Sequence, residues 1–288
     1  MRWLVTGANG QLGRDLVRQL PGNDVTALTR RDLDLTDESA VREVVGSWAA
    51  AGSDAAVIVN AAAYTAVDAA ETDEAAALTV NGRAPGWIAE EAAGRARLIH
   101  VSTDYVFAGD ATAPYEPGDP VGPRTAYGRT KLAGESAVLA ADPDAYVVRT
   151  AWVFAAHGGN FLRTMLRLER ERDTVQVVDD QLGSPTWTRH LAGGLVELAG
   201  SGAPAGLYHC VGEGVTTWHG LAAAVFADVG ADPSRVLPVS TARFPRPAPR
   251  PAYSVLSTRA WAGAGLTPLP SWRVGVRGAV AGAVTSAD

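Results

Sequence analysis

The chain lacks the features that would crosslink it or place it in a membrane. Cys210 is the one cysteine among 288 residues, so no disulfide can form within the chain and we expect a reducing compartment. No apolar run is long enough for a signal peptide or a bilayer span, because polar residues interrupt even the alanine-rich stretch 54–71. We therefore expect a soluble, cytoplasmic protein that does not contact membranes.

Strong charge of one sign and clustered metal ligands are also missing. The formal net charge is −6 and the basic side chains are scattered rather than gathered in a patch, which argues against nucleic acid as a partner. None of the five histidines stands at metal-ligand spacing from a cysteine or an acidic residue. His100 lies in a predicted strand and suits a packed residue, so we expect no metal site.

The first half of the chain alternates short β-rich runs with helical patterns. The apolar runs cover residues 2–7, 24–28, 55–61, 97–103 and 145–151, and the helical patterns begin near Gln11, Asp37, Thr72 and Thr125. Strands without polar alternation are buried on both faces of a sheet, and helices between them imply parallel pairing. The pattern predicts an α/β fold with a Rossmann-like, doubly wound parallel sheet.

The second half is less regular and predicts a smaller α/β substrate-binding lobe. Its expected elements are a helix over 160–172, a strand at 175–178, a helix from Thr188, a strand at 206–212 and a helix capped by Thr217. We expect residues 1–150 to form an NAD(P)-binding domain and 151–288 mainly the second lobe, with about 188–212 returning to the first domain. The proline-rich segment 243–254 should form a loop or a polyproline-like arm.

A glycine-rich turn follows the first predicted strand. Gly7, Gly10 and Gly13 stand between that strand and the first predicted helix. Residues without Cβ allow a tight turn and a close approach of a pyrophosphate, and the N-terminus of the helix supplies N–H donors. Because the glycines stand at this place, they predict dinucleotide binding.

The end of the second strand bears on the choice of dinucleotide. Arg30 and Arg31 follow it, and no acidic residue stands directly after the strand. A guanidinium can receive the 2′-phosphate of NADPH, which a carboxylate would repel. The sequence therefore favours NADPH. It leaves open whether NADH is also accepted and whether the arginines only form a solvated turn.

A tyrosine and a lysine stand four residues apart in "AYGRTKLAGE", so Tyr127 and Lys131 share one face of a helix. The fourth strand brings Thr103 to the carboxyl edge of the sheet, where ligands of such folds bind. Reduction of a ketone needs hydride on carbon and a proton on the developing alkoxide. We expect Tyr127 to give the proton, Lys131 to lower its pKa and bind the nicotinamide ribose, and Thr103 to hold the carbonyl oxygen.

These motifs resemble a known family. The spacing of the glycines and the Tyr-x-x-x-Lys pair are similar to those of extended short-chain dehydrogenases/reductases. In order along residues 1–199, "VNAAAYTAVDAAE", "STDYVFAG", "YGRTKLAGE", "RTAWVF", "NFLRTML" and "DDQLGSPT" resemble the dTDP-4-dehydrorhamnose reductases. The resemblance implies transfer of hydride from NADPH to C4 of dTDP-4-dehydro-6-deoxy-L-mannose, which gives dTDP-L-rhamnose.

The resemblance also implies which residues bind each ligand. With the glycine turn and Arg30, it predicts cofactor contacts from Gly7, Gly10, Gln11, Leu12, Gly13, Arg30, Asp34, Leu35, Ala61, Ala62, Ala63, Tyr64, Thr65, Tyr127 and Lys131. It predicts substrate contacts from Thr103, Asp104, Tyr105, Tyr127, Trp152 and Asn160. Family members often carry histidine in place of Tyr64.

Other functions remain open on the sequence. Related dehydratases carry Asp-Glu after the threonine, whereas Thr103 is followed by Asp104 and Tyr105, so simple reduction is favoured. A dTDP-4-keto-6-deoxyhexose reductase of a secondary-metabolite pathway is one alternative, and a non-catalytic nucleotide-binding regulatory subunit is another. Some family members form metal-linked dimers, but the nearly uncharged segment 277–288 offers no clear acidic ligands, so we expect a monomer or a weak homodimer.

Overall fold

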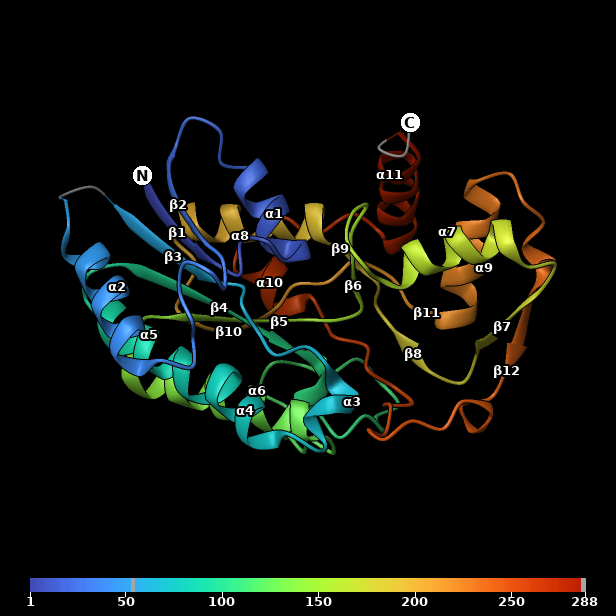
Figure 1. Cartoon of the computed structure of the whole chain (residues 1–288), viewed down its shortest axis with the longest axis horizontal. Helices are drawn as coiled ribbons and strands as arrows, with labels where there is room; N and C mark the ends of the chain where they lie inside the picture. Colours follow the sequence, from blue (N-terminus) through green and yellow to red (C-terminus); the bar gives the residue numbers. More distant parts are fainter. Residues whose placement is uncertain (53–54, 286–288) are drawn as a thin grey trace.

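The computed structural model describes residues 1–52 and 55–285 and shows two lobes side by side (Figure 1). The last three residues of the nearly uncharged C-terminal segment lie outside this range. The first lobe contains the large sheet and most of the N-terminal half of the chain. The second lobe contains the helices α7, α9 and α11. No helix in the described part of the chain is long and apolar enough to cross a bilayer.

The first lobe is built on one parallel sheet of six strands. They are β1 (Arg2–Thr6), β2 (Asp24–Leu28), β3 (Ala56–Asn60), β4 (Arg97–Thr103), β5 (Tyr146–Thr150) and β10 (Gly206–His209). Their order is β10-β5-β4-β3-β1-β2, and every neighbouring pair is parallel. This confirms the predicted doubly wound sheet. Because the chain order reverses at β1, the carboxyl ends of β1 and β3 flank the crevice in which such folds bind ligands.

Helices cover both faces of this sheet. One face packs against α1 (Gln11–Arg18), α8 (Thr188–Gly200) and α10 (Arg259–Gly263), and the other against α2 (Glu38–Ala50), α5 (Ala84–Ala92) and α6 (Ala126–Ala141). The strands alternate between these two cores: Val57 and Val59 of β3 point to the α1 side, and Ile58 points to the α5 side. Burial on both faces explains why these strands read as uninterrupted apolar runs.

The helix expected near Thr72 is divided into pieces, so that prediction was too simple. The segment forms α3 (Val67–Ala70), α4 (Glu74–Leu78), a π-helical turn η1 (Thr79–Arg83) and then α5. Pro85, in the first turn of α5, has no N–H to donate to the carbonyl of Asn81, four residues earlier. The π-turn accommodates this missing bond, and it buries Asn81, whose side chain bonds both the N–H and the carbonyl of Tyr64.

The second lobe packs three helices against three short strand pairs. The helices are α7 (Phe161–Glu171), α9 (Trp218–Asp228) and α11 (Trp272–Thr285). The pairs are β7 (Val175–Val178) with β12 (Val236–Val239), β6 (Val153–Phe154) with β9 (Thr186–Trp187), and β8 (Leu182–Gly183) with β11 (Thr216–Thr217). Asn160 and Thr217 cap α7 and α9 by accepting backbone N–H bonds, close to the predicted starts. Short 3₁₀ turns are η2 (Asp104–Val106), η3 (Pro233–Arg235) and η4 (Thr241–Arg243).

Two later segments contribute to the first lobe. β10 pairs with β5 at one edge of the large sheet, and α8 packs against α1. These contacts support the proposed division of the chain, in which about 188–212 belong with residues 1–150. The proline-rich segment 243–254 has no helix or strand beyond the end of η4 and an isolated bridge at Tyr253.

A buried ion pair joins α6 to β5. Arg149 donates to the two carboxylate oxygens of Glu135 at 2.9 and 2.6 Å, and the two side chains are only 2% and 3% exposed. The same guanidinium donates to the carbonyl of Pro117 at 3.1 Å and lies 4.9 Å from the centre of the Phe107 ring. The pair therefore ties the sheet, the helix and the segment 107–117 together.

Replacing Glu135 with leucine should lower the free energy of unfolding by about 3–5 kcal/mol, because the Arg149 charge would stay buried without its partner. The double variant Glu135→Leu/Arg149→Met should recover much of this loss. Glu171→Leu, which breaks the exposed Arg167–Glu171 pair on α7, serves as the control and should cost under about 1 kcal/mol. Urea unfolding followed by circular dichroism measures the three differences. Equal losses for Glu135→Leu and Glu171→Leu would contradict this role.

Candidate active site

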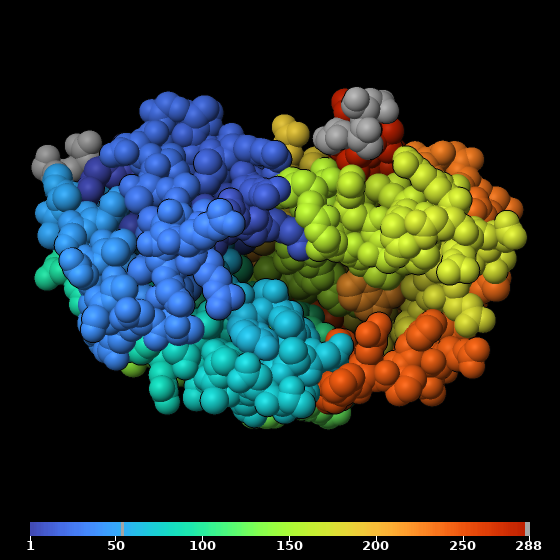
Figure 2. Space-filling model, in the orientation of Figure 1, coloured from blue at the N-terminus to red at the C-terminus, as the bar shows by residue number. Residues whose placement is uncertain are grey.

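A cavity of ≈ 1400 Å3 lies between the two lobes at the carboxyl ends of the large sheet. Figure 2 shows the hollow between the blue and cyan surface of the first lobe and the yellow-green surface of the second. Apart from Gly13 and Asn160, every residue predicted to bind cofactor or substrate lies in the wall of this cavity. The folding of distant segments thus brings the two predicted sets of residues to one place.

The glycine turn forms one end of the cavity. Gly7 has a φ of +67°, and a Cβ there would lie 2.8 Å from the backbone of Ala62. Gly10 caps α1 without a side chain, so the first N–H groups of the helix stay available to an anion. A Cβ on Gly13 would lie 2.2 Å from the carbonyl of Gly7, so Gly13 permits the tight turn and is not part of the wall. These features fit the pyrophosphate of a dinucleotide.

The turn after β2 forms the neighbouring part of the wall. Arg30 and Asp34 line the cavity, whereas Arg31 does not. Asp34 accepts hydrogen bonds at 2.9 Å from both the N–H and the hydroxyl of Thr36, which lowers the pKa of its carboxyl. Asp32 accepts from the N–H and hydroxyl of Thr29, so its carboxylate stabilises the turn itself. Arg30 is therefore the residue of this turn that can meet a 2′-phosphate.

The three predicted catalytic side chains line the same cavity near the end of β4. Thr125 caps α6 by accepting from the N–H of Gly128 at 3.0 Å, which places Tyr127 in the first turn of the helix. The Thr103 side chain hydrogen-bonds the Tyr127 hydroxyl, and the Thr103 hydroxyl donates to Asp104 Oδ1 at 2.9 Å. A row of polar groups therefore runs from the half-buried Tyr127 through Thr103 to Asp104, and the last two are buried.

The electrostatics of Tyr127 differ from the expectation that Lys131 lowers its pKa. Burial raises the pKa of Tyr127 to about 12, although the bond from Thr103 opposes this, and the Asp104 charge raises it further. Lys131 donates to the carbonyl of Val101 at 2.7 Å, and burial lowers its pKa to about 8. Tyr127 therefore holds its proton at neutral pH, as the proton donor of a reduction must.

Lys131 also contacts a buried histidine. Its Nζ lies 3.3 Å from Nε2 of His100, and the other ring nitrogen of His100 lies 3.1 Å from the amide nitrogen of Asn60. His100 is fully buried, as the sequence suggested, and burial with the Lys131 charge holds its pKa well below the usual value. Thr6 donates to Asn60 at 2.7 Å, so polar side chains of β1, β3 and β4 connect in a row that ends at Lys131.

Trp152 lies in the cavity wall with a backbone conformation that side chains rarely adopt. Its φ is +46°, and its ring stacks on Trp218 with centroids 3.8 Å apart. Its Nε1 donates to the Ser254 hydroxyl at 3.2 Å. A Cβ on Gly183 would lie 2.3 Å from the indole, so a glycine is needed there. Strain held in place by packing is typical of functional sites and supports the predicted contact of Trp152 with the substrate.

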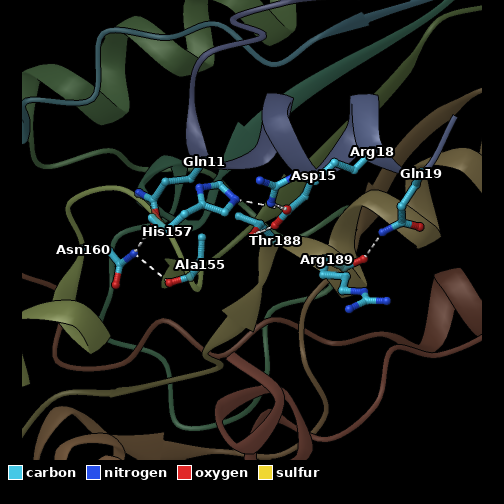
Figure 3. A network of polar contacts seen from close by, with 9 residues as sticks. All are labelled: Gln11, Asp15, Arg18, Gln19, Ala155, His157, Asn160, Thr188 and Arg189. Atoms are coloured by element: carbon cyan, nitrogen blue, oxygen red, sulfur yellow. Dashed lines mark hydrogen bonds and ion pairs between the residues drawn. The ribbon is translucent and has the colours of Figure 1, made fainter. Parts of the chain in front are cut away.

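A polar network joins the cofactor end of the cavity to the second lobe (Figure 3). Asp15 of α1 accepts from Nε2 of His157 at 3.0 Å and from the Thr188 hydroxyl, and Gln11 accepts from the Asn160 amide at 2.9 Å. The same amide donates to the carbonyls of Ala155 and His157. Asn160 lies outside the cavity wall, and its amide links Gln11 to the second lobe, so its contact with the substrate stays a prediction.

Several wall residues escaped the sequence-based prediction. Besides the predicted residues, the second lobe contributes His157, Phe161, Trp218, Phe244, Arg246 and Arg250. Phe161 stands in the motif "NFLRTML", and the other five lie outside the quoted motifs. For Phe244, Arg246 and Arg250, the density of arginine and proline in the segment 243–254 was the available signal. Within residues 1–52 and 55–285, no group of three or more His, Cys, Asp or Glu side chains is arranged to hold a metal ion.

The pKa of Asp104 leads to a prediction about stability. Burial raises the pKa of this carboxyl from 3.8 to about 6. The native state then binds the proton more tightly than the unfolded state, so the free energy of unfolding falls as the pH rises from about 4 to about 6. A shift of roughly 2 units corresponds to about 3 kcal/mol.

Asp104→Asn removes this titration. The difference in unfolding free energy between the variant and the wild type should therefore increase in favour of the variant by about 3 kcal/mol between about pH 4 and pH 7. Urea unfolding of both proteins across this range measures the difference. Parallel pH profiles would contradict the raised pKa.

The family model described as the RmlD substrate binding domain matches residues 1–284. A dTDP-4-dehydrorhamnose reductase of Streptomyces griseus is 52% identical over 281 residues, which cover 94% of this chain and 90% of that protein. A probable dTDP-4,6-dihydroxy-2-methyloxan-3-one 4-ketoreductase of Streptomyces antibioticus is 50% identical, with 96% and 94% covered.

Solved structures agree with this result. A dTDP-4-dehydrorhamnose reductase of Clostridium acetobutylicum superposes with a TM-score of 0.90 at 37% identity, covering 98% of this chain and 99% of that one. The reductase of Bacillus anthracis, solved in complex with NADP, has a TM-score of 0.89 at 35% identity and covers 96% of each chain. These matches confirm the resemblance predicted from the motifs: the chain belongs to the RmlD family of dTDP-4-dehydrorhamnose reductases.

Proposed function

We propose that this enzyme reduces the C4 ketone of dTDP-4-dehydro-6-deoxy-L-mannose with NADPH and forms dTDP-L-rhamnose. The observation that supports it best is that Thr103, Tyr127 and Lys131 line one cavity with the glycine turn, in a chain about half identical to reductases of this name. A relative solved with NADP supports the cofactor.

The residues divide the chemistry between them. Bound NADPH supplies the hydride. Tyr127, whose hydroxyl keeps its proton at neutral pH, gives that proton to the oxygen of the ketone as negative charge develops there. Thr103 bonds the Tyr127 hydroxyl and directs it, and Lys131, one helical turn away, is the residue proposed to bind the nicotinamide ribose. The dTDP group supplies binding energy at a distance from the reacting carbon, which positions the sugar.

A related 4-ketoreductase acting on another dTDP-sugar is the second candidate. The Streptomyces antibioticus relative, at 50% identity, carries the name of a probable 4-ketoreductase of this kind, so a chain this similar is named for a different ketone. A non-catalytic subunit is disfavoured because the cavity wall contains both Tyr127 and Lys131. The buried free thiol of Cys210 agrees with a cytoplasmic enzyme, and a monomer or weak homodimer stays a prediction.

Turnover of dTDP-4-dehydro-6-deoxy-L-mannose with NADPH, followed by NMR of the product, tests the assignment. An equatorial C4 hydroxyl is expected. An axial hydroxyl, or faster turnover of dTDP-4-dehydro-6-deoxy-D-glucose, would support the second candidate instead. No oxidation of NADPH with either sugar would contradict both.

Tyr127→Phe should lower kcat by about 10²–10⁴, because the proton donor is lost, and should leave the affinity for NADPH nearly unchanged. Steady-state kinetics and titration of NADPH fluorescence measure the two effects. Tyr146→Phe removes a buried hydroxyl that bonds the carbonyl of Ala203 far from the triad and should keep its kcat. Full activity of Tyr127→Phe would refute the mechanism.

Arg30→Ala should lower the ratio of kcat/KM for NADPH over NADH about tenfold, the loss of one charge-assisted bond to the 2′-phosphate. Arg31→Ala is the matched control, since it removes the same charge from the same turn outside the cavity wall. If the two variants keep the ratio of the wild type, the arginines only face water.

A further inference from the structure

The proline-rich arm, residues 243–254, runs from the second lobe to the first along the cavity. Figure 1 shows the chain leaving β12 and passing below β8 toward α3, and in Figure 2 its orange surface meets the cyan surface of the first lobe. The arm is fixed at both lobes. Tyr253 donates its N–H to the carbonyl of Gly109 at 3.0 Å, and Leu182 exchanges backbone bonds of 2.8 Å with Ala252 and Ser254.

Gly109 shows how closely the arm packs. A Cβ at this glycine, whose φ is +80°, would lie 2.4 Å from Cβ of Pro251. The prolines also restrict the backbone of the segment between its anchors. The side chains of the arm are therefore held at a defined place along the cavity, and Phe244, Arg246, Arg250 and Pro251 form part of its wall.

The two arginines of the arm in the wall compete for one carboxylate. Arg250 donates to Asp68 of α3 at 2.9 Å and to the carbonyl of Ala248 at 2.9 Å, and its side chain is 23% exposed. Arg246 reaches the same carboxylate only at 3.9 Å, and its side chain is 59% exposed. One negative charge faces two positive ones, so the arm keeps a guanidinium whose donors remain available to a ligand.

The rest of this half of the cavity offers no other strong anion site. Among the described wall residues that follow Lys131 in the chain, only Arg246 and Arg250 carry a permanent charge. The neighbouring wall is apolar and aromatic, with Phe161, Met165 and Trp218. An apolar surface beside two guanidinium groups suits a ligand with a flat base and a phosphate group.

We propose that Arg246 binds the diphosphate of the sugar nucleotide, while Arg250, paired with Asp68, holds the arm in position. This inference rests on the proposed function, because it takes the ligand to be a nucleotide diphosphate. A guanidinium binds phosphate oxygens in a bidentate manner, and such charge-assisted bonds are about twice as strong as neutral ones. The arm thereby acts on the affinity for the nucleotide sugar and not on the transfer of hydride.

Inhibition by dTDP and by thymidine separates the phosphate contact from every other effect of a substitution. Arg246→Ala should raise the Ki of dTDP and the KM of the dTDP-keto sugar about tenfold, and leave kcat and the Ki of thymidine unchanged. Arg243→Ala, which removes the same charge from the same arm outside the cavity wall, should match the wild type in all four constants. Arg246→Lys should recover part of the affinity for dTDP.

Several results would overturn the inference. The first is an unchanged Ki of dTDP in Arg246→Ala. The second is an equal loss of affinity for dTDP and for thymidine, which would mark a merely structural role. The third is a loss of affinity confined to NADPH. The proposed function fails separately. If the wild type reduces no dTDP-4-keto sugar but binds dTDP through Arg246, the inference stands. If the wild type reduces the sugar and Arg246→Ala does so with the same KM, only the inference falls.

Discussion

The packing of α6 against β4 and β5 is the contact on which the site depends. This contact buries two cations, Lys131 and Arg149, and a buried charge without a partner costs several kcal/mol. Lys131 donates to the carbonyl of Val101, and Arg149 donates from Nε and Nη2 to the two carboxylate oxygens of Glu135 at 2.9 and 2.6 Å. A shift of the helix by one residue would leave both cations unpaired. The position of α6 that keeps these bonds places Tyr127 beside Thr103 at the carboxyl edge of the sheet.

Helix α1 performs the corresponding task at the cofactor end. Its N-terminus leaves N–H groups open beside Gly10, and its side chains Gln11 and Asp15 bond Asn160 and His157 of the second lobe. The same short helix therefore begins at the glycine turn and bonds the second lobe. Because these bonds are partly buried, the position of the second lobe is coupled to the geometry of the glycine turn.

The buried surroundings of Tyr127 suit the direction of the reaction. A phenol whose pKa is raised to about 12 stays protonated at neutral pH, and it gives its proton to a strongly basic alkoxide more readily than to water. Thr103 directs the hydroxyl, and nothing in this part of the site depends on the identity of the sugar. Trp152 and the arm form the wall of the cavity on the side of the second lobe.

Local sequence determined the strands, the glycine turn and the Tyr127–Lys131 pair, because periodicity, missing side chains and helical spacing act over a few residues. Only the tertiary structure decided how these parts behave. The pKa of Tyr127 is raised because parts of the chain distant in sequence bury the side chain. The amide of Asn160 donates to Gln11, which lies 149 residues away in the sequence. Arg250 meets Asp68 across 182 residues, a pairing that no local pattern records. The sequence by itself therefore determined the type of chemistry. Because burial and long-range pairing depend on the whole chain, only the fold decided the protonation of the groups and the place of the arm.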